Sequence, residues 1–271
     1  MMPKITRITT QKKHKDRYNI FLDDGGGEKY GFSVDESILV EYRLRKQMEL
    51  DDSTVTVLIQ KDTLHKHYTL AINYLSYRMR TKKEMRDYLV QKEVDEEHIS
   101  QIMKKLNEEG LTDDREFARS FVRTRMNTSS KGPILVRQEL LQKGVAEELA
   151  SEAVAIYSFD VQFEKALKLA EKNLRSNSKK SFRQQVQKMQ GTLMQKGFTG
   201  DVVKEVTSEL QNQKDDDAEW EALVKQGEKL LHKHRQKYSG FQLSQKVKEA
   251  LYRKGFTIDL INTFLDEYME Q

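Results

Sequence analysis

The chain has 271 residues, of which 47 are Lys or Arg and 43 are Asp or Glu, so the formal net charge is only +4. Because it has no cysteine, it can form neither a disulfide framework nor a thiolate metal site. The sequence contains no long apolar run and no hydrophobic stretch behind its charged opening residues, which argues against a membrane span or a secretory signal and makes the cytoplasm the expected compartment.

Short aromatic and β-branched runs predict a small β-rich domain over residues 1–62. The runs cover 5–8, 18–22, 30–34 and 55–59. We expect the loop Asp23–Gly27 to join the second and third runs as a hairpin, since glycine reaches positive φ at little steric cost. Asp35 or Ser37 can cap a short helix that ends near Tyr42, before the last predicted strand.

One tetrapeptide then recurs four times, at spacings of 51, 53 and 58 residues. The copies are Leu89–Lys92, Leu140–Lys143, Leu193–Lys196 and Leu251–Lys254. Apolar residues follow each lysine at helical spacing, so the pattern predicts a mainly α chain of tandem three-helix repeats that form an elongated, curved array. The predicted repeats are 63–110, 111–158, 159–213 and 214–271.

Capping signals place the helices inside these repeats. We expect helices near 65–78, 81–92 and 95–109 in the first repeat and near 113–126, 133–143 and 146–157 in the second. Thr81 and Glu84 form a capping box, and Pro133 stands at a helix start. Gly144, Gly197 and Gly255 follow the tetrapeptide, where a helix end favours a left-handed residue.

Clusters of positive charge recur near the junction between the first and second helix of each repeat. The candidate binding residues for a polyanionic partner or nucleic acid are Arg78, Arg80, Lys82, Lys83, Arg123, Arg125, Lys131, Arg137, Lys179, Lys180, Arg183, Lys233, Arg235 and Lys237. A chain this rich in basic residues shows clusters by chance, and lysines at helix ends complement the helix dipole. Recurrence at one structural place favours a positive stripe instead.

Several stretches resemble the signature regions of the RecX regulators. They are Tyr74–Met85 followed by Leu89, Gly110–Ala118 with Arg123, and Lys131–Pro133 leading to Leu140. The opening residues Pro3–Thr6, with Tyr18–Leu22, are similar to the extended form of this family in Gram-positive bacteria. The similarity covers essentially the whole chain.

This resemblance implies a cytoplasmic, non-catalytic modulator of the recombinase RecA, with a function in homologous recombination, DNA repair and the SOS response. RecX proteins bind in the groove of RecA filaments on single-stranded DNA, where they inhibit ATP hydrolysis and strand exchange. The resemblance implies no cofactor and no membrane partner. The polar surface favours a monomer.

Enzymatic alternatives have little support in the sequence. No phosphate-binding Gly-rich loop with Lys is present. The pairs His65 with His67 and His232 with His234 need further ligands to hold a metal, and we expect both to be surface residues. The acids Asp215–Asp217 open a predicted helix and suit its dipole. Aromatic residues including Trp220 and Phe241 fit core spacing. We therefore predict no metal site.

Two classes of function stay open at this stage: a regulator of a recombinase filament, and a helical-repeat protein that binds nucleic acid by itself without sequence preference. A nuclease is a distant third. Comparing the affinity for bare single-stranded DNA with that for a RecA filament separates the first two.

Overall fold

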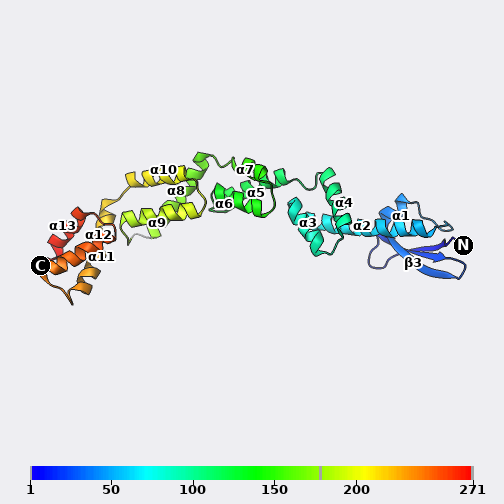
Figure 1. The fold of residues 1–271 in the computed structure, drawn as a ribbon, viewed down its shortest axis with the longest axis horizontal. Helices are drawn as coiled ribbons and strands as arrows, with labels where there is room; N and C mark the ends of the chain where they lie inside the picture. Colours follow the sequence, from blue (N-terminus) through cyan, green and yellow to red (C-terminus); the bar gives the residue numbers. More distant parts are fainter. Residues whose placement is uncertain (1, 177–178, 270–271) are drawn as a thin grey trace. The chain divides into compact units, whose positions relative to one another are not determined.

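The computed structural model describes residues 2–176 and 179–269. It divides the chain into two compact units, Met1–Phe117 and Ala118–Gln271 (Figure 1). In the described residues a three-stranded sheet precedes thirteen helices. The predicted class, a mainly α chain of three-helix repeats with a small N-terminal sheet, is confirmed.

The N-terminal sheet is antiparallel, with β1 (Lys4–Thr10), β2 (Arg17–Asp23) and β3 (Glu28–Asp35) in that order. Ile20 of the middle strand pairs with Ile8 and Phe32 and is fully buried. The predicted hairpin loop is confirmed, since the Asp23 carboxylate accepts the N–H groups of Gly25 and Gly27. Asp35 caps helix α1 (Glu36–Glu41), because its side chain accepts the Ser37 N–H.

The strand predicted over 55–59 is wrong, because these residues belong to the long helix α2 (Asp52–Ser76). The Asp51 carboxylate caps this helix by accepting the Thr54 N–H at 2.6 Å. Leu58 is fully buried against the sheet, whereas Val57 and Ile59 are 42% and 45% exposed. The buried residues of this run therefore recur at the spacing of a helix and not at every second position, as they would in a strand. Packing against the sheet has overridden the strand propensity of this valine-rich run.

Each repeat contains three helices. The first combines the second half of α2 with α3 (Lys82–Gln91) and α4 (Glu96–Glu108). The second contains α5 (Asp114–Thr128), α6 (Pro133–Gln142) and α7 (Glu147–Val154). The third contains α8 (Phe159–Ser176), α9 (Phe182–Gln195) and α10 (Gly200–Asn212), and the fourth α11 (Asp216–His234), α12 (Gly240–Arg253) and α13 (Ile258–Met269).

The recurring tetrapeptide is the C-terminal cap of the second helix in each repeat. Its leucines, Leu89, Leu140, Leu193 and Leu251, are all fully buried. Their carbonyl oxygens accept the N–H groups of Val94, Val145, Phe198 and Phe256, five residues further on, and these side chains are buried as well. Such a bond across a left-handed residue is a Schellman cap with its apolar contact. The motif therefore ends the helix and places two apolar side chains, one before and one after the cap, in the core.

The left-handed position of this cap holds glycine in three repeats. Gly144, Gly197 and Gly255 have φ of 84°, 82° and 87°. In the first repeat Glu93 adopts φ of 58° at the same place. Glu93 is exposed, so this position of the cap accepts a residue with a side chain at some conformational cost.

Within the second unit, neighbouring repeats dock through these caps. Gly132 N–H donates to the carbonyl oxygen of Lys196 at 2.7 Å, and Ile134 N–H donates to that of Gly197 at 3.1 Å. In the same way Ser181 Oγ, at the start of α9, donates to the carbonyl oxygen of Lys254. The cap of one repeat thus binds the N-terminus of the second helix in the repeat before it.

Candidate partner-binding surface

The predicted cations lie near the junctions between the first and second helices, as the helix boundaries require. Eight of them are exposed, and among the described residues their side chains have neither a carboxylate within ion-pairing distance nor a hydrogen bond. These eight, called here the unpaired cations, are Lys82, Lys83, Arg123, Lys179, Lys180, Arg183, Lys233 and Lys237. Each repeat contributes at least one, so every junction presents positive charge that is available to a partner.

Arg78 is exposed but its charge is compensated within the chain. Its guanidinium lies 3.1 Å from Glu84, the residue that completes the predicted capping box with Thr81. Arg78 also donates to the carbonyl oxygen of Met79 at 2.8 Å. This arginine therefore orders the turn before α3, and its net contribution to a positive surface is small.

Arg80 stacks on an aromatic column. Its guanidinium lies 4.0 Å from the centre of the Tyr74 ring, and Tyr74 stacks on Tyr88 with centroids 3.8 Å apart and planes 5° from parallel. Arg80 Nε is buried without a hydrogen-bond partner in the described part of the chain. Such a cation–π contact fixes the position of the arginine in the first repeat.

Arg125 and Lys131 both pair with Glu139 of α6. Arg125 Nε lies 2.7 Å from one carboxylate oxygen, and Lys131 Nζ contacts the other. Burial alone raises the pKa of Glu139, but the hydrogen bonds from Lys131 and Arg125 outweigh it and lower that pKa below its ordinary value. The carboxylate stays ionised and holds α5, the following loop and α6 together.

Arg137 and Arg235 are also engaged inside the chain. Arg137 contacts Glu147 and donates to Ser151 Oγ at 3.0 Å, which ties α6 to α7. Arg235 donates to the carbonyl oxygen of Tyr268 at 3.4 Å and lies beside a hollow that is also lined by His232 and Gln236. The sequence could not separate these residues from the unpaired cations, because their acceptors come from other helices.

Two exposed aromatic side chains accompany the basic junctions. Tyr77 is 84% exposed directly before Arg78, and Phe241 is 79% exposed in the first turn of α12. The expectation that Phe241 belongs to the core is therefore wrong. At the start of α12 its side chain lies outside the core around Leu243 and Val247. Exposed aromatic rings beside cations are typical of surfaces that contact unpaired bases.

The acidic run before α11 acts as a helix cap. Asp215 accepts the N–H groups of Asp217 and Ala218 at 3.0 and 3.1 Å, as its place before a helix predicted.

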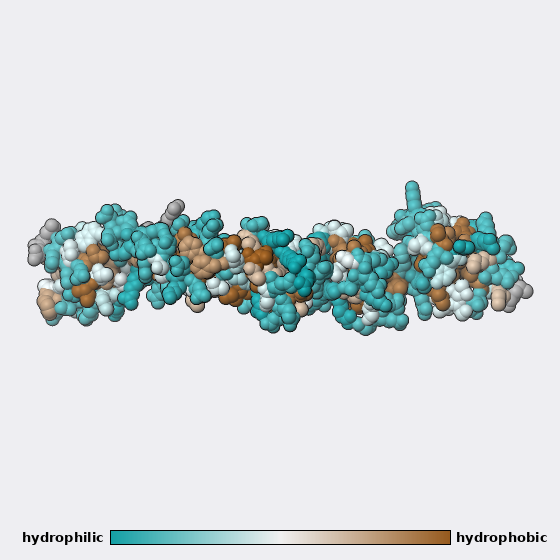
Figure 2. All heavy atoms as spheres, turned by 90° about the horizontal axis from the view of Figure 1, so that it is seen from above, coloured by the Kyte–Doolittle hydropathy of each residue, from teal (hydrophilic) through white to brown (hydrophobic). Residues whose placement is uncertain are grey.

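Hydrophilic residues cover much of the face shown in Figure 2, with hydrophobic residues gathered between them. Across residues 2–176 and 179–269, no helix combines the length and apolarity needed to cross a bilayer.

Family models for RecX match almost the whole chain. The RecX N-terminal domain matches residues 3–51, the first three-helix domain 68–106 and the second 113–154. The third three-helix domain matches twice, at 160–207 and 217–265. The chain belongs to the RecX family. The double match indicates that its third and fourth repeats are two copies of one RecX module.

Whole-chain relatives agree with this assignment. The chain is 54% identical to a protein named Regulatory protein RecX from Oceanobacillus iheyensis over 270 residues, 99% of each chain. It is 42% identical to a protein of the same name from Bacillus cytotoxicus, with all of both chains covered. Both relatives are thus named as regulatory proteins.

Two solved RecX structures also resemble the chain. A structure described as regulatory protein RecX aligns with a TM-score of 0.67 at 39% identity, covering 76% of this chain and 100% of that one. RecX from Lactobacillus salivarius aligns with a TM-score of 0.54 at 39% identity, covering 56% of this chain and 98% of that one. The RecX fold thus accounts for the repeats described above.

Proposed function

We propose that this protein regulates homologous recombination by binding RecA filaments on single-stranded DNA and inhibiting their ATP hydrolysis and strand exchange. The observation that carries this proposal is the whole-length match to proteins named as RecX regulators. We further propose that it acts in the cytoplasm as a monomer and without catalytic chemistry of its own.

The distribution of charge supports a repeating partner. The unpaired cations occur at the same junction in successive repeats, so one chain offers several similar contacts in tandem. A filament offers identical subunits in tandem, and a single recombinase monomer does not. Linked weak contacts raise the effective concentration of each next contact, which selects the filament over the free subunit.

Docking between repeats supports the same partner. In the second unit the caps around Gly197 and Gly255 bind the starts of α6 and α9, so the basic junctions of these repeats are held by hydrogen bonds to backbone carbonyl oxygens. Less conformational entropy is then lost when several junctions bind together. A regulator of this kind needs only a higher affinity for one filament conformation than for the others.

A second candidate function is direct binding of single-stranded DNA. The exposed rings of Tyr77 and Phe241, close to cations at two junctions, favour it. Stacking of bases on such rings is tolerant of sequence, and phosphate contacts supply the remaining affinity.

Fluorescence anisotropy with a labelled oligonucleotide separates the two. We expect the protein to bind a preformed RecA filament at least tenfold more tightly than the same bare DNA at matched salt. Equal affinities would contradict the filament proposal and support the nucleic-acid alternative. Titration of RecA ATPase then tests inhibition, and an unchanged rate at saturating protein would contradict the regulatory proposal.

A further inference from the structure

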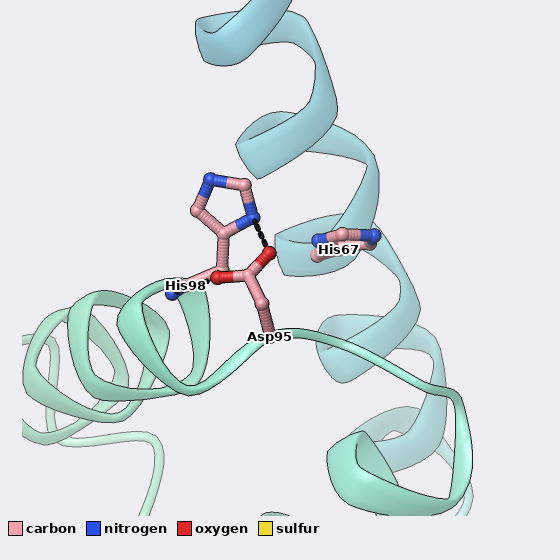
Figure 3. Close-up of side chains that lie close together, drawn as sticks. All are labelled: His67, Asp95 and His98. Atoms are coloured by element: carbon pink, nitrogen blue, oxygen red, sulfur yellow. Dashed lines mark hydrogen bonds and ion pairs between the residues drawn. The ribbon is translucent and has the colours of Figure 1, made fainter.

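Three potential metal ligands meet in the first repeat, although they are distant in the sequence. His67 lies on α2, whereas Asp95 and His98 lie at the start of α4, and the three side chains gather between these helices (Figure 3). One ligand atom from each of them lies within 4.8 Å of the other two. The helix crossing, and no local motif, brings them together.

Asp95 has one carboxylate oxygen committed to the fold and one available. Its Oδ1 accepts the His98 N–H at 2.9 Å and thereby caps α4. Its Oδ2 lies 2.9 Å from His98 Nδ1 and faces the space between the imidazoles. A ligand can therefore bind Oδ2 while Oδ1 continues to cap the helix.

His67 carries a buried nitrogen without a partner, since its Nδ1 is shielded from solvent and forms no hydrogen bond within the described residues. Nδ1 of His98 is buried as well, and its one printed neighbour is Asp95 Oδ2. The two rings are 5.3 Å apart. A buried polar nitrogen without a partner is costly, and a metal ion bound between the two helices would remove that cost at His67.

The chemistry of the three side chains suits a cation. Two imidazoles and one carboxylate form a donor set that zinc uses in proteins.

We propose that His67, Asp95 and His98 bind one Zn²⁺ ion, with water completing its coordination. Ligand atoms about 2.0–2.2 Å from a tetrahedral zinc ion lie about 3.4 Å from each other. Asp95 Oδ2 and His98 Nδ1, which are 2.9 Å apart, must therefore separate slightly, whereas His67 must move closer to them. Asp95 is 60% and His98 18% exposed at the side chain, which leaves room for rotation. The bound ion would link α2 to the first turn of α4.

Among the histidines, the sequence pattern singles out only those two residues apart, from which we predict no metal site. His65 and His67, two residues apart, lie on different sides of α2: His65 Nε2 lies 3.3 Å from Asp35 of the N-terminal domain, while His67 faces His98. Residues two apart on a helix point in different directions, so this pair by itself cannot hold one ion. The site nevertheless forms, because Asp95 and His98 supply the ligands that His65 cannot.

Isothermal titration of the tag-free, chelator-treated full chain with ZnCl₂ tests the proposal. We expect one ion per chain, and at least a tenfold loss of affinity in H67A and in H98A. D95N is a second test, since asparagine still caps α4 but is a weaker ligand. H65A and the double variant H232A/H234A are matched controls and should bind as the parent does.

Cobalt gives an independent readout. Co²⁺ at the same site should produce visible absorption of a low-coordinate nitrogen and oxygen environment in the parent chain, and H67A should abolish it. Circular dichroism of each variant establishes that the chain remains folded. Absence of a one-to-one isotherm, or binding that survives in H67A and H98A, would overturn the proposal.

Discussion

Gly132 and Gly197 meet backbone to backbone, so that a Cβ atom on Gly132 would lie 2.3 Å from the carbonyl oxygen of Gly197. The hydrogen bonds at this contact between the second and third repeats, from Gly132 N–H to Lys196 and from Ile134 N–H to Gly197, join backbone atoms. Glycine at position 132 is required by the close approach and not by its dihedral angles, because its φ of −83° is open to any residue.

We expect G132A to weaken the docking of these two repeats. The added methyl group must displace the cap at Gly197, at a cost of about 1–3 kcal/mol that is typical of overpacking. Hydrogen exchange at Gly132 and Ile134, whose N–H groups bind Lys196 and Gly197, measures the loss locally. G191A is the control, since a Cβ on Gly191 of α9 meets nothing within 4 Å and should stabilise the helix by about 1 kcal/mol. Equal protection in parent and G132A would contradict this account.

Glu219 links the third and fourth repeats through a buried carboxylate. It is 5% exposed and accepts the Phe182 N–H at the start of α9 at 2.7 Å. We expect E219A to lower stability by about 1–3 kcal/mol, because it leaves this N–H unsatisfied. E219Q keeps an acceptor and removes a buried charge, so it should cost little. Chemical denaturation at neutral pH ranks the three proteins, and equal losses in both variants would refute the role of the acceptor.

The pH dependence of Glu219 follows from the same burial. Burial raises its pKa above the unfolded value, so the folded chain binds the proton more readily. Stability of the parent relative to E219Q should therefore rise as the pH falls through the folded pKa of Glu219. A difference between the two proteins that does not vary with pH would show that Glu219 is solvated.

Asp62 anchors α2 to the sheet. Arg17 donates to both of its carboxylate oxygens, at 3.1 and 2.8 Å, and the Asp35 N–H donates at 2.9 Å. The side chains of Asp62 and Arg17 are only 3% and 13% exposed. D62N should therefore destabilise the chain by about 3–5 kcal/mol, because a buried guanidinium loses its partner. E49Q breaks the Lys4–Glu49 pair, exposed by about half on each side, and should cost under about 1 kcal/mol.

Acid should remove the contribution of Asp62. Burial alone raises its pKa, but hydrogen bonds from Arg17 and Lys66 lower it below the ordinary value. A depressed pKa in the folded state adds stability above the unfolded pKa of about 3.9 and loses it as the pH falls through the folded pKa. The difference between parent and D62N in denaturant midpoint should accordingly shrink below about pH 4, whereas a constant difference would argue against the ion pair.

The unpaired cations should set the salt dependence of filament binding. The variant K82Q/K83Q/K179Q/K180Q tests this, and K12Q/K13Q/K15Q/K46Q is its matched control, since it removes the same number of exposed charges from the N-terminal domain. The first variant should flatten the plot of log affinity against log salt by roughly 0.7 for each phosphate that the protein no longer neutralises, if those lysines meet single-stranded DNA. Equal slopes in the two variants would place the phosphate-binding residues elsewhere.

The sequence alone determined the features that local chemistry encodes. Caps such as Thr81 with Glu84, the left-handed glycines and the helical spacing of apolar residues fix where most helices begin and end. These signals depend on neighbouring residues, so they can be read without knowing the fold. The resemblance to the RecX family added the expected partner.

Only the tertiary structure decided which distant groups meet. In it, residues 55–59 belong to α2, and Arg125 and Lys131 pair with Glu139. His67 also lies beside Asp95 and His98. The approach of Gly132 to Gly197 leaves even less trace in the sequence, because it joins two backbones. Burial on the sheet, crossing of helices and docking of caps depend on the geometry of packed elements, and the local sequence pattern does not contain that geometry.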